Sequence, residues 1–326
     1  MSNPVRTLLA LAMALCLLPL QTARAADDAG AKKKILLLAG GPSHGFGAHD
    51  HLSGCHLLAK RLNESNLGVE ATVIQGWPKE KGELDGAAAV IMYCDGGEGH
   101  MALTHAKDLD ALYDKGVGIG CIHYAVEVPN GKPGERWMKY MGGYFATNWS
   151  VNPHWTAKFT KLPQHPVANG VRPFTTNDEW YYNMRFREGM QGVTPILSAV
   201  PPDSTRQGKD DAHGGNPEVR KGVGKNQTEH VVWVSENANG SRGFGCTGGH
   251  VHWNWAQDDF RKTILNAIVW VAKVDVPKDG VKSSRPTVDE LLTHHDEPVP
   301  PKFDKEEMAK RIEAMNKPME GQAQAK

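Results

Sequence analysis

The chain has 326 residues, of which 40% are hydrophobic, and its 37 Lys and Arg residues balance its 37 Asp and Glu residues. It contains no basic block and no basic stripe interleaved with aromatic residues, which excludes a typical nucleic-acid partner. The first 25 residues have the pattern of a secretory leader, with Arg6, an apolar stretch over 8–20 and an A-x-A site at 23–25. We therefore predict a signal peptide over 1–25 and an exported protein, periplasmic or extracellular. No second apolar run approaches membrane-spanning length, so no membrane span is expected.

Strands and helices alternate regularly in the first half of the remaining chain. Apolar runs predict strands at 35–39, 69–74, 87–94 and 117–122, and helical spacing predicts helices at 50–65 and 103–114. This β-α-β order implies an α/β protein with an open, mostly parallel sheet flanked by helices, as in flavodoxin-like folds.

The second half is less regular until about residue 230. Strands are predicted at 155–161 and 195–200, and the polar stretch 204–226 is predicted to be an exposed insertion. Strands at 230–235 and 243–247 and a helix at 258–273 follow. The residues from 276 to 326 are rich in Pro and charge, with one short helix at 305–316, and are predicted to form a flexible or surface-docked tail. One α/β domain over 26–275 is therefore expected.

Several histidines follow predicted strands at Gly-rich turns. His44 and His49 follow the first strand, His123 follows the fourth, and His250 follows the last. The carboxyl ends of parallel strands lie on the edge of a sheet where ligands bind. We expect these imidazoles to meet there, with His123 and His250 closer than about 15 Å, because such a site works only at contact range.

The residue types at this edge suggest acid/base or metal chemistry. His123 is predicted to be a general base or acid, or a metal ligand, with a core-capping histidine as the alternative. Asp95 and Glu179 are predicted to be supporting carboxylates, with turn capping or a solvated loop as the alternatives. His44, His49 and His250 are candidate ligands of a divalent metal, zinc or manganese.

Four further residues are candidates for substrate binding. Gly41 and Ser43 lie in a Gly-rich loop that opens a helix, where backbone amides bind polar groups. Trp180 and Trp253 are candidates for stacking on sugar rings, although tryptophans are also ordinary core residues. The Gly-rich loop matches neither a P-loop nor a dinucleotide-binding fingerprint, so no nucleotide cofactor is expected.

The cysteines of the mature chain show no C-x-x-C spacing. We expect them to be free and buried; oxidation after export is the alternative, for which spacing assigns no pairing. The four are Cys55, Cys94, Cys121 and Cys246.

A set of motifs in order along 35–274 resembles the ThuA-like (trehalose utilisation) family, whose fold is similar to class I glutamine amidotransferases. They are the SHG at 43–45, GVGIGCIHYAVE at 116–127, GGYF at 142–145, HPVANGV at 165–171, DEWY at 178–181 and TGGH at 247–250. The resemblance implies carbohydrate metabolism, with 3-keto-glycosides as substrates. It also puts His123 where amidotransferases have their nucleophile, so glutaminase activity is not expected.

These observations together predict an enzyme that acts on a small carbohydrate, a glycoside or 3-keto-glycoside, by acid/base chemistry in a histidine-lined, metal-assisted cleft. The alternatives are a non-catalytic carbohydrate-binding module and a metal-dependent amide or ester hydrolase. The sequence makes no prediction of the oligomeric state.

Overall fold

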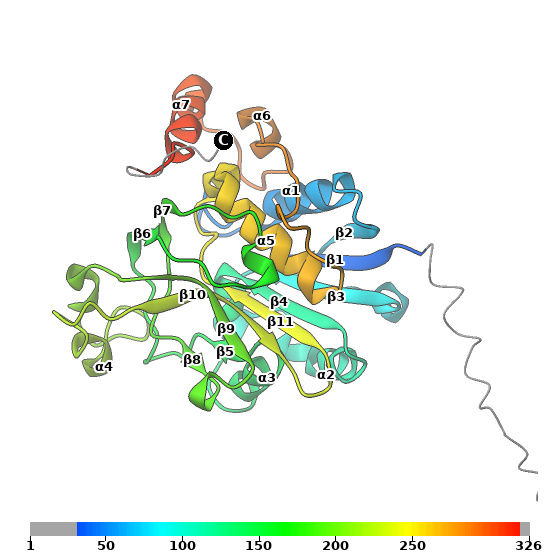
Figure 1. Cartoon of the computed structure of the whole chain (residues 1–326), viewed down its shortest axis with the longest axis horizontal. Helices are drawn as coiled ribbons and strands as arrows, with labels where there is room; N and C mark the ends of the chain where they lie inside the picture. Colours follow the sequence, from blue (N-terminus) through cyan, green and yellow to red (C-terminus); the bar gives the residue numbers. More distant parts are fainter. Residues whose placement is uncertain (1–30, 320–326) are drawn as a thin grey trace, which may run out of the picture. The chain divides into compact units, whose positions relative to one another are not determined.

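The computed structural model describes residues 31–319, so the predicted leader over 1–25 lies outside the described residues. A seven-stranded sheet in the order β2-β1-β3-β4-β11-β10-β9 forms its centre (Figure 1). The strands are β1 (Lys33–Ala39), β2 (Val69–Gln75), β3 (Ala87–Tyr93), β4 (Gly118–Ile122), β9 (Val193–Ala199), β10 (Glu229–Glu236) and β11 (Arg242–Cys246). Strand β10 is antiparallel to both of its neighbours, and the other six strands run in one direction. This confirms the predicted mostly parallel α/β sheet.

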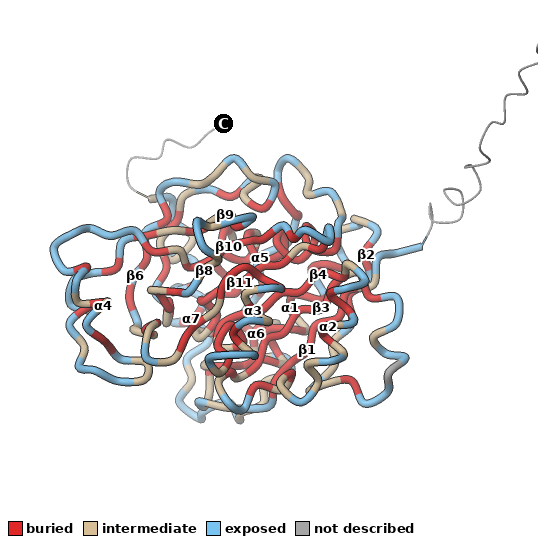
Figure 2. Tube along the Cα trace, turned by 90° about the horizontal axis from the view of Figure 1, so that it is seen from below, coloured by how far each residue is buried: buried red, intermediate tan, exposed pale blue. Residues whose placement is uncertain are grey.

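The central strands of the sheet are buried on both faces, which explains why β1 and β3 are nearly uninterrupted apolar runs. In β1, Ile35 and Leu37 pack into one core, and Leu36 and Leu38 pack into the other. Helices α1 (His51–Glu64) and α5 (Asp258–Val271) contribute to the first core, and α2 (Ala106–Asp114) and α3 (Lys132–Met141) contribute to the second. The central strands are accordingly buried along their length, while the outer loops are exposed (Figure 2).

Irregular insertions between β4 and β10 add two short antiparallel pairs. They are β6 (His154–Phe159) with β7 (Phe174–Glu179), and β5 (Gly143–Tyr144) with β8 (Arg185–Phe186). The sequence did not predict α3, whose Pro-Gly start resembles a turn, nor β7, whose polar residues alternate with buried ones. The polar stretch 204–226 is mostly irregular, with one short helix, α4 (Pro217–Arg220).

The described part of the tail packs against the domain. Helix α6 (Val288–Leu291) lies against α1, and α7 (Lys305–Met315) lies against α6. Leu291, Met308 and Ile312 are buried in the same core as α1 and α5. Apolar burial therefore anchors the tail up to residue 319.

Candidate functional site

Four adjacent parallel strands deliver polar side chains to one edge of the sheet. His49 lies in the loop after β1, Asp95 comes two residues after β3, His123 directly follows β4, and His250 lies in the loop after β11. Glu179 ends β7, which brings it to the same edge. The imidazole rings of His123 and His250 are 5.3 Å apart, which confirms the predicted convergence.

Three ring nitrogens and one carboxylate oxygen meet at the centre of this edge. His49 Nε2 lies 2.9 Å from His123 Nε2 and 3.0 Å from His250 Nδ1. Glu179 Oε2 lies 3.0 Å from His250 Nδ1 and 3.4 Å from His123 Nε2. All four ligand-type atoms are within 4.8 Å of one another, and we call these four residues the histidine cluster.

Hydrogen bonds on the far side of two rings determine which nitrogens carry protons. His49 Nδ1 donates to Asp95 Oδ1 at 2.8 Å, and His123 Nδ1 donates to the Thr247 carbonyl at 2.8 Å. Because a carboxylate and a carbonyl only accept, both Nδ1 atoms hold a proton. In the neutral rings, the two Nε2 atoms therefore face each other with lone pairs at 2.9 Å. A cation between them, a proton or a metal ion, is needed to remove this repulsion.

Burial argues against a proton in that position. His49 is 2% exposed, and burial lowers its pKa to about 3, although the Asp95 hydrogen bond acts in the opposite direction. Burial alone would raise the pKa of Glu179, but its contacts with His123 and His250 outweigh burial and lower it. The cluster thus places the neutral imidazole of His49 near the ionised carboxylate of Glu179, and metal binding requires ligands in these protonation states.

The spacing of the cluster also fits a metal ion. A tetrahedral zinc with bonds of about 2.0–2.1 Å has its ligand atoms about 3.3 Å apart, and the close contacts here are 2.9–3.4 Å. Three histidines and one carboxylate are a donor set that zinc accepts. The contacts of His49 with Asp95 and of His123 with Thr247 are the outer partners that commonly orient metal-bound histidines.

Three residues with left-handed backbone conformations lie in the cluster or beside it. His44, His49 and His123 have φ angles of 65°, 51° and 55°, in the left-handed region that residues other than glycine rarely adopt. His123 stands at the turn between β4 and the following 3₁₀ turn, directly after the strand as the sequence predicts. Strain held by a surrounding fold is typical of functional positions.

The loop that carries His250 is held by residues that the sequence analysis missed. The buried Asp178 carboxylate accepts hydrogen bonds from the amides of Gly249 and Val251, at 2.9 and 3.2 Å. Tyr181 places its hydroxyl 3.2 Å from His123 Nε2 and 3.3 Å from Glu179 Oε2. Both residues belong to the DEWY motif, in which the sequence pattern indicates only Glu179 and Trp180.

Ser43, Asp95 and His44 form a second group beside the cluster. The Ser43 hydroxyl donates to Asp95 at 2.9 Å and lies 2.9 Å from His44 Nδ1. The His44 ring lies 3.8 Å from the His49 ring, tilted by 34°, and His44 is exposed to solvent. His44 therefore lies outside the histidine cluster, whereas His123 and Glu179, predicted as catalytic groups, lie within it. The predicted Gly41 is exposed, and its carbonyl contacts His51 at 3.0 Å.

The two predicted sugar-stacking tryptophans do not line the cleft with free faces. Trp180 is fully buried and packs on Phe159 and Phe260, so this prediction of a substrate contact is wrong. Trp253 is half-buried and packs on Phe46 and Phe303. A buried indole stabilises the core and offers no surface to a sugar.

The four cysteines are buried and unpaired, as predicted. Burial raises the pKa of Cys121, two residues before His123, well above its usual value. A thiol held in this protonated state is a poor nucleophile. We therefore assign the candidate chemistry at this edge to the histidine cluster and not to Cys121.

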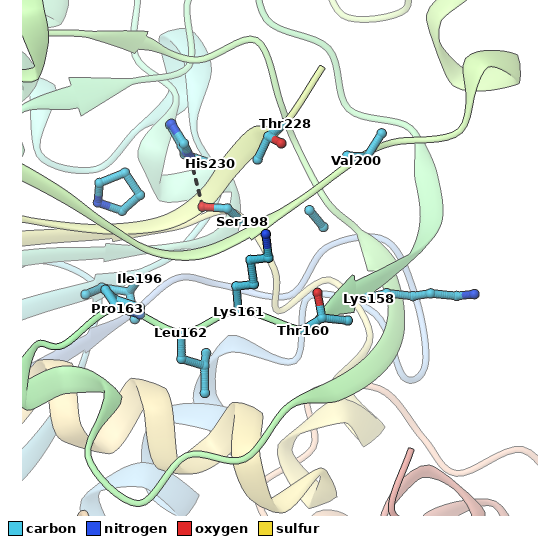
Figure 3. Close-up of a pocket in the computed structure, with 12 residues that line it drawn as sticks. Lys158, Thr160, Lys161, Leu162, Pro163, Ile196, Ser198, Val200, Thr228 and His230 are labelled. Carbon is cyan, nitrogen blue, oxygen red and sulfur yellow. Dashed lines mark hydrogen bonds between the residues drawn. The ribbon is translucent and has the colours of Figure 1, made fainter. Parts of the chain in front are cut away.

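A separate hollow of about 520 Å³ lies beside β6 and β9 (Figure 3). Lys158, Lys161, Ser198 and His230 are among its lining residues, and His230 Nδ1 is 2.9 Å from Ser198 Oγ. It shares no residue with the histidine cluster, and its lining contains no carboxylate. We therefore assign the candidate chemistry to the cluster and not to this hollow.

Across residues 31–319, no helix is both long and apolar enough to cross a bilayer.

Comparison with known proteins gives a family and a set of similar folds. The family model described as ThuA, trehalose utilisation, matches residues 34–271. A ThuA-like protein from Bacteroides uniformis ATCC 8492 has 17% identity and a TM-score of 0.52, over 83% of this chain and 100% of that one. A ThuA-like protein from Parabacteroides merdae ATCC 43184 has 14% identity and a TM-score of 0.51, over 77% and 95%.

A third solved structure is a Thermoplasma acidophilum protein described as a GMP synthase subunit. It has 11% identity and a TM-score of 0.40, over 74% of this chain and 96% of that one. Comparison with curated proteins gives no match.

Proposed function

Because the chain belongs to the ThuA family of trehalose-utilisation proteins, we propose that it is an exported enzyme that acts on a glycoside or 3-keto-glycoside. The histidine cluster is its reaction centre and holds a divalent metal, zinc or manganese. The observation that carries this proposal is the pair of Nε2 lone pairs of His49 and His123, which face each other at 2.9 Å in a buried site.

His49, His123, His250 and Glu179 would hold the ion, and Asp95 would keep the His49 ring in the binding tautomer. When bound, a divalent metal supplies Lewis-acid polarisation of a carbonyl oxygen. In this proposal His123 is a metal ligand. The proton transfer that the sequence suggested for His123 therefore requires another base.

His44 is placed to be that base. Its Nδ1 proton is donated to Ser43 Oγ, whose own proton is donated to Asp95. This chain of hydrogen bonds leaves His44 Nε2 unprotonated and exposed at the mouth of the cluster. An unprotonated ring nitrogen can accept a proton from a bound substrate.

A 3-keto-glycoside has an acidified C2 hydrogen next to its carbonyl. His44 Nε2 takes this proton, and the electron pair moves into the C2–C3 enolate. When the pair returns to form the C1–C2 double bond, the C1–O bond breaks, and the released sugar oxygen takes a proton. Delivery of a proton to the opposite face of C2, without C1–O cleavage, gives the C2 epimer instead.

The test uses 3-keto-trehalose carrying deuterium at C2, incubated with the purified mature protein with zinc, with manganese, and after chelation. We expect metal-dependent loss of the deuterium to water. His44→Gln should lose at least about 100-fold in rate, the usual worth of a general base, and keep its metal. His123→Ala should lose both metal and turnover, whereas His105→Gln, a histidine at the start of α2, should behave as wild type.

Two results would contradict the proposal. One is release of sugar with full retention of deuterium at C2, which would indicate hydrolysis. The other is metal-independent turnover that is unchanged in His44→Gln.

A further inference from the structure

A second group of metal-ligand side chains lies behind the histidine cluster, where the tail meets the domain. Asp50 follows His49 in the chain, His252 comes two residues after His250, and His295 comes from the tail. Ligand-type atoms of these three residues lie within 4.8 Å of one another. The group shares no residue with the histidine cluster.

The polar atoms of this group are buried without hydrogen-bond partners. Asp50 and His252 are 2% and 0% exposed, and the His295 side chain is 4% exposed. Asp50 Oδ2, His252 Nδ1 and both ring nitrogens of His295 have no hydrogen-bond partner within the described chain. Leaving a buried polar atom unpaired costs about 1–3 kcal/mol, so several in one place indicate a missing binding partner.

The geometry between the three side chains suggests what the partner is. Asp50 Oδ1 lies 2.9 Å from His295 Nδ1 but without the direction of a hydrogen bond. His252 Nε2 lies 2.8 Å from the Leu291 carbonyl, which fixes the proton on Nε2 and leaves Nδ1 as a lone pair facing the group. Ligand atoms that approach closely without hydrogen bonding are typical of donors arranged around a shared cation.

We infer that Asp50, His252 and His295 bind a divalent cation of the zinc type that fastens the C-terminal tail to the domain. Phe46 and Trp253 pack on the His295 ring, at 5.1 and 5.9 Å, and shield the site. The cation joins the loops after β1 and β11, which carry the histidine cluster, to a segment that lies beyond the family match at residue 271.

The experiment measures zinc per chain in full-length mature protein after dialysis against metal-free buffer. We expect two zinc ions in the wild type, one in His295→Ala and one in His123→Ala. The matched control is His294→Ala, because His294 is the adjacent residue but stacks on His56 at 3.9 Å outside the group. It should keep two ions. His295→Cys restores a zinc ligand and should return the count to two.

The rate of limited proteolysis within the tail measures directly whether the cation holds the tail on the domain. The tail between residues 293 and 305 should be cut at least about tenfold faster in His295→Ala or after chelation, and in His294→Ala at the wild-type rate. The inference is overturned if His295→Ala holds as much zinc as the wild type, or if zinc leaves the rate of tail cleavage unchanged. A single zinc that is lost in His295→Ala but retained in His123→Ala would support the tail site and contradict the metal proposed for the histidine cluster.

Discussion

Replacing Asp95 by Asn tests how the histidine cluster is prepared for metal binding. The carboxylate accepts the His49 Nδ1 proton at 2.8 Å and the Ser43 hydroxyl proton at 2.9 Å. Both protons go to Oδ1, and Asn keeps an acceptor oxygen there, so the substitution removes the negative charge while nearly preserving the shape and the acceptor. Loss of such an outer partner weakens metal binding by about 10–100-fold, or about 1.4–2.8 kcal/mol.

The assay is competition for zinc between the protein and a chromophoric chelator at pH 7. Asp95→Asn should bind the cluster zinc about 10–100-fold more weakly than the wild type. Asp85→Asn is the matched control, because Asp85 is exposed and lies just before β3, at the opposite end of that strand. Equal affinities in Asp95→Asn and the wild type would refute the view that Asp95 orients His49 for a metal ion.

Three other predictions follow from the same geometry. Burial lowers the pKa of His100 to about 4, so the folded state takes up its proton only at lower pH than the unfolded state. The free energy of unfolding therefore falls as the pH decreases from 6.5 towards 4. In denaturant titrations at pH 7 and pH 4.5, the free energy of unfolding of His100→Gln should fall by about 2 kcal/mol less than that of the wild type. An equal fall in both proteins would contradict this. A Cβ on Gly248 would lie 2.3 Å from the Trp180 ring, so Gly248→Ala should cost about 1–3 kcal/mol of stability and weaken zinc binding; unchanged values would show that the loop adapts freely. Chelation should lower the Tm by roughly 5–10 °C, which corresponds to about 3–4 kcal/mol of lost binding energy, and a Tm that does not respond to chelator or added zinc would argue against a bound metal.

The sheet and the meeting of the histidines could be predicted from local patterns. Fully apolar runs such as 35–39 can only be strands buried on both faces, and parallel strands bring their carboxyl ends to one edge. Glycine-rich turns after these runs then identified His49, His123 and His250 as neighbours, although 201 residues separate His49 from His250.

The grouping of the site residues could not be predicted, because it depends on side-chain direction. The sequence placed His44 among the metal ligands and His123 among the catalytic groups. In the structure His123 lies in the histidine cluster, and His44 lies beside it in a second group of ligand-type atoms with His49 and Asp95. Trp180 has the same sequence context as Glu179, yet it follows the strand and points into the core. His295 was not considered, because no local pattern shows that the tail returns to the loops after β1 and β11.

The central claim is that the histidine cluster binds a metal, and anomalous diffraction tests it most directly. Crystals of the mature protein grown with zinc should show an anomalous peak at about 2.0–2.1 Å from the two Nε2 atoms of His49 and His123, from His250 Nδ1 and from Glu179 Oε2. The account would be contradicted if no anomalous peak appeared between these four atoms while zinc fully occupied another site. It would also be contradicted if the only peaks were bound by surface groups.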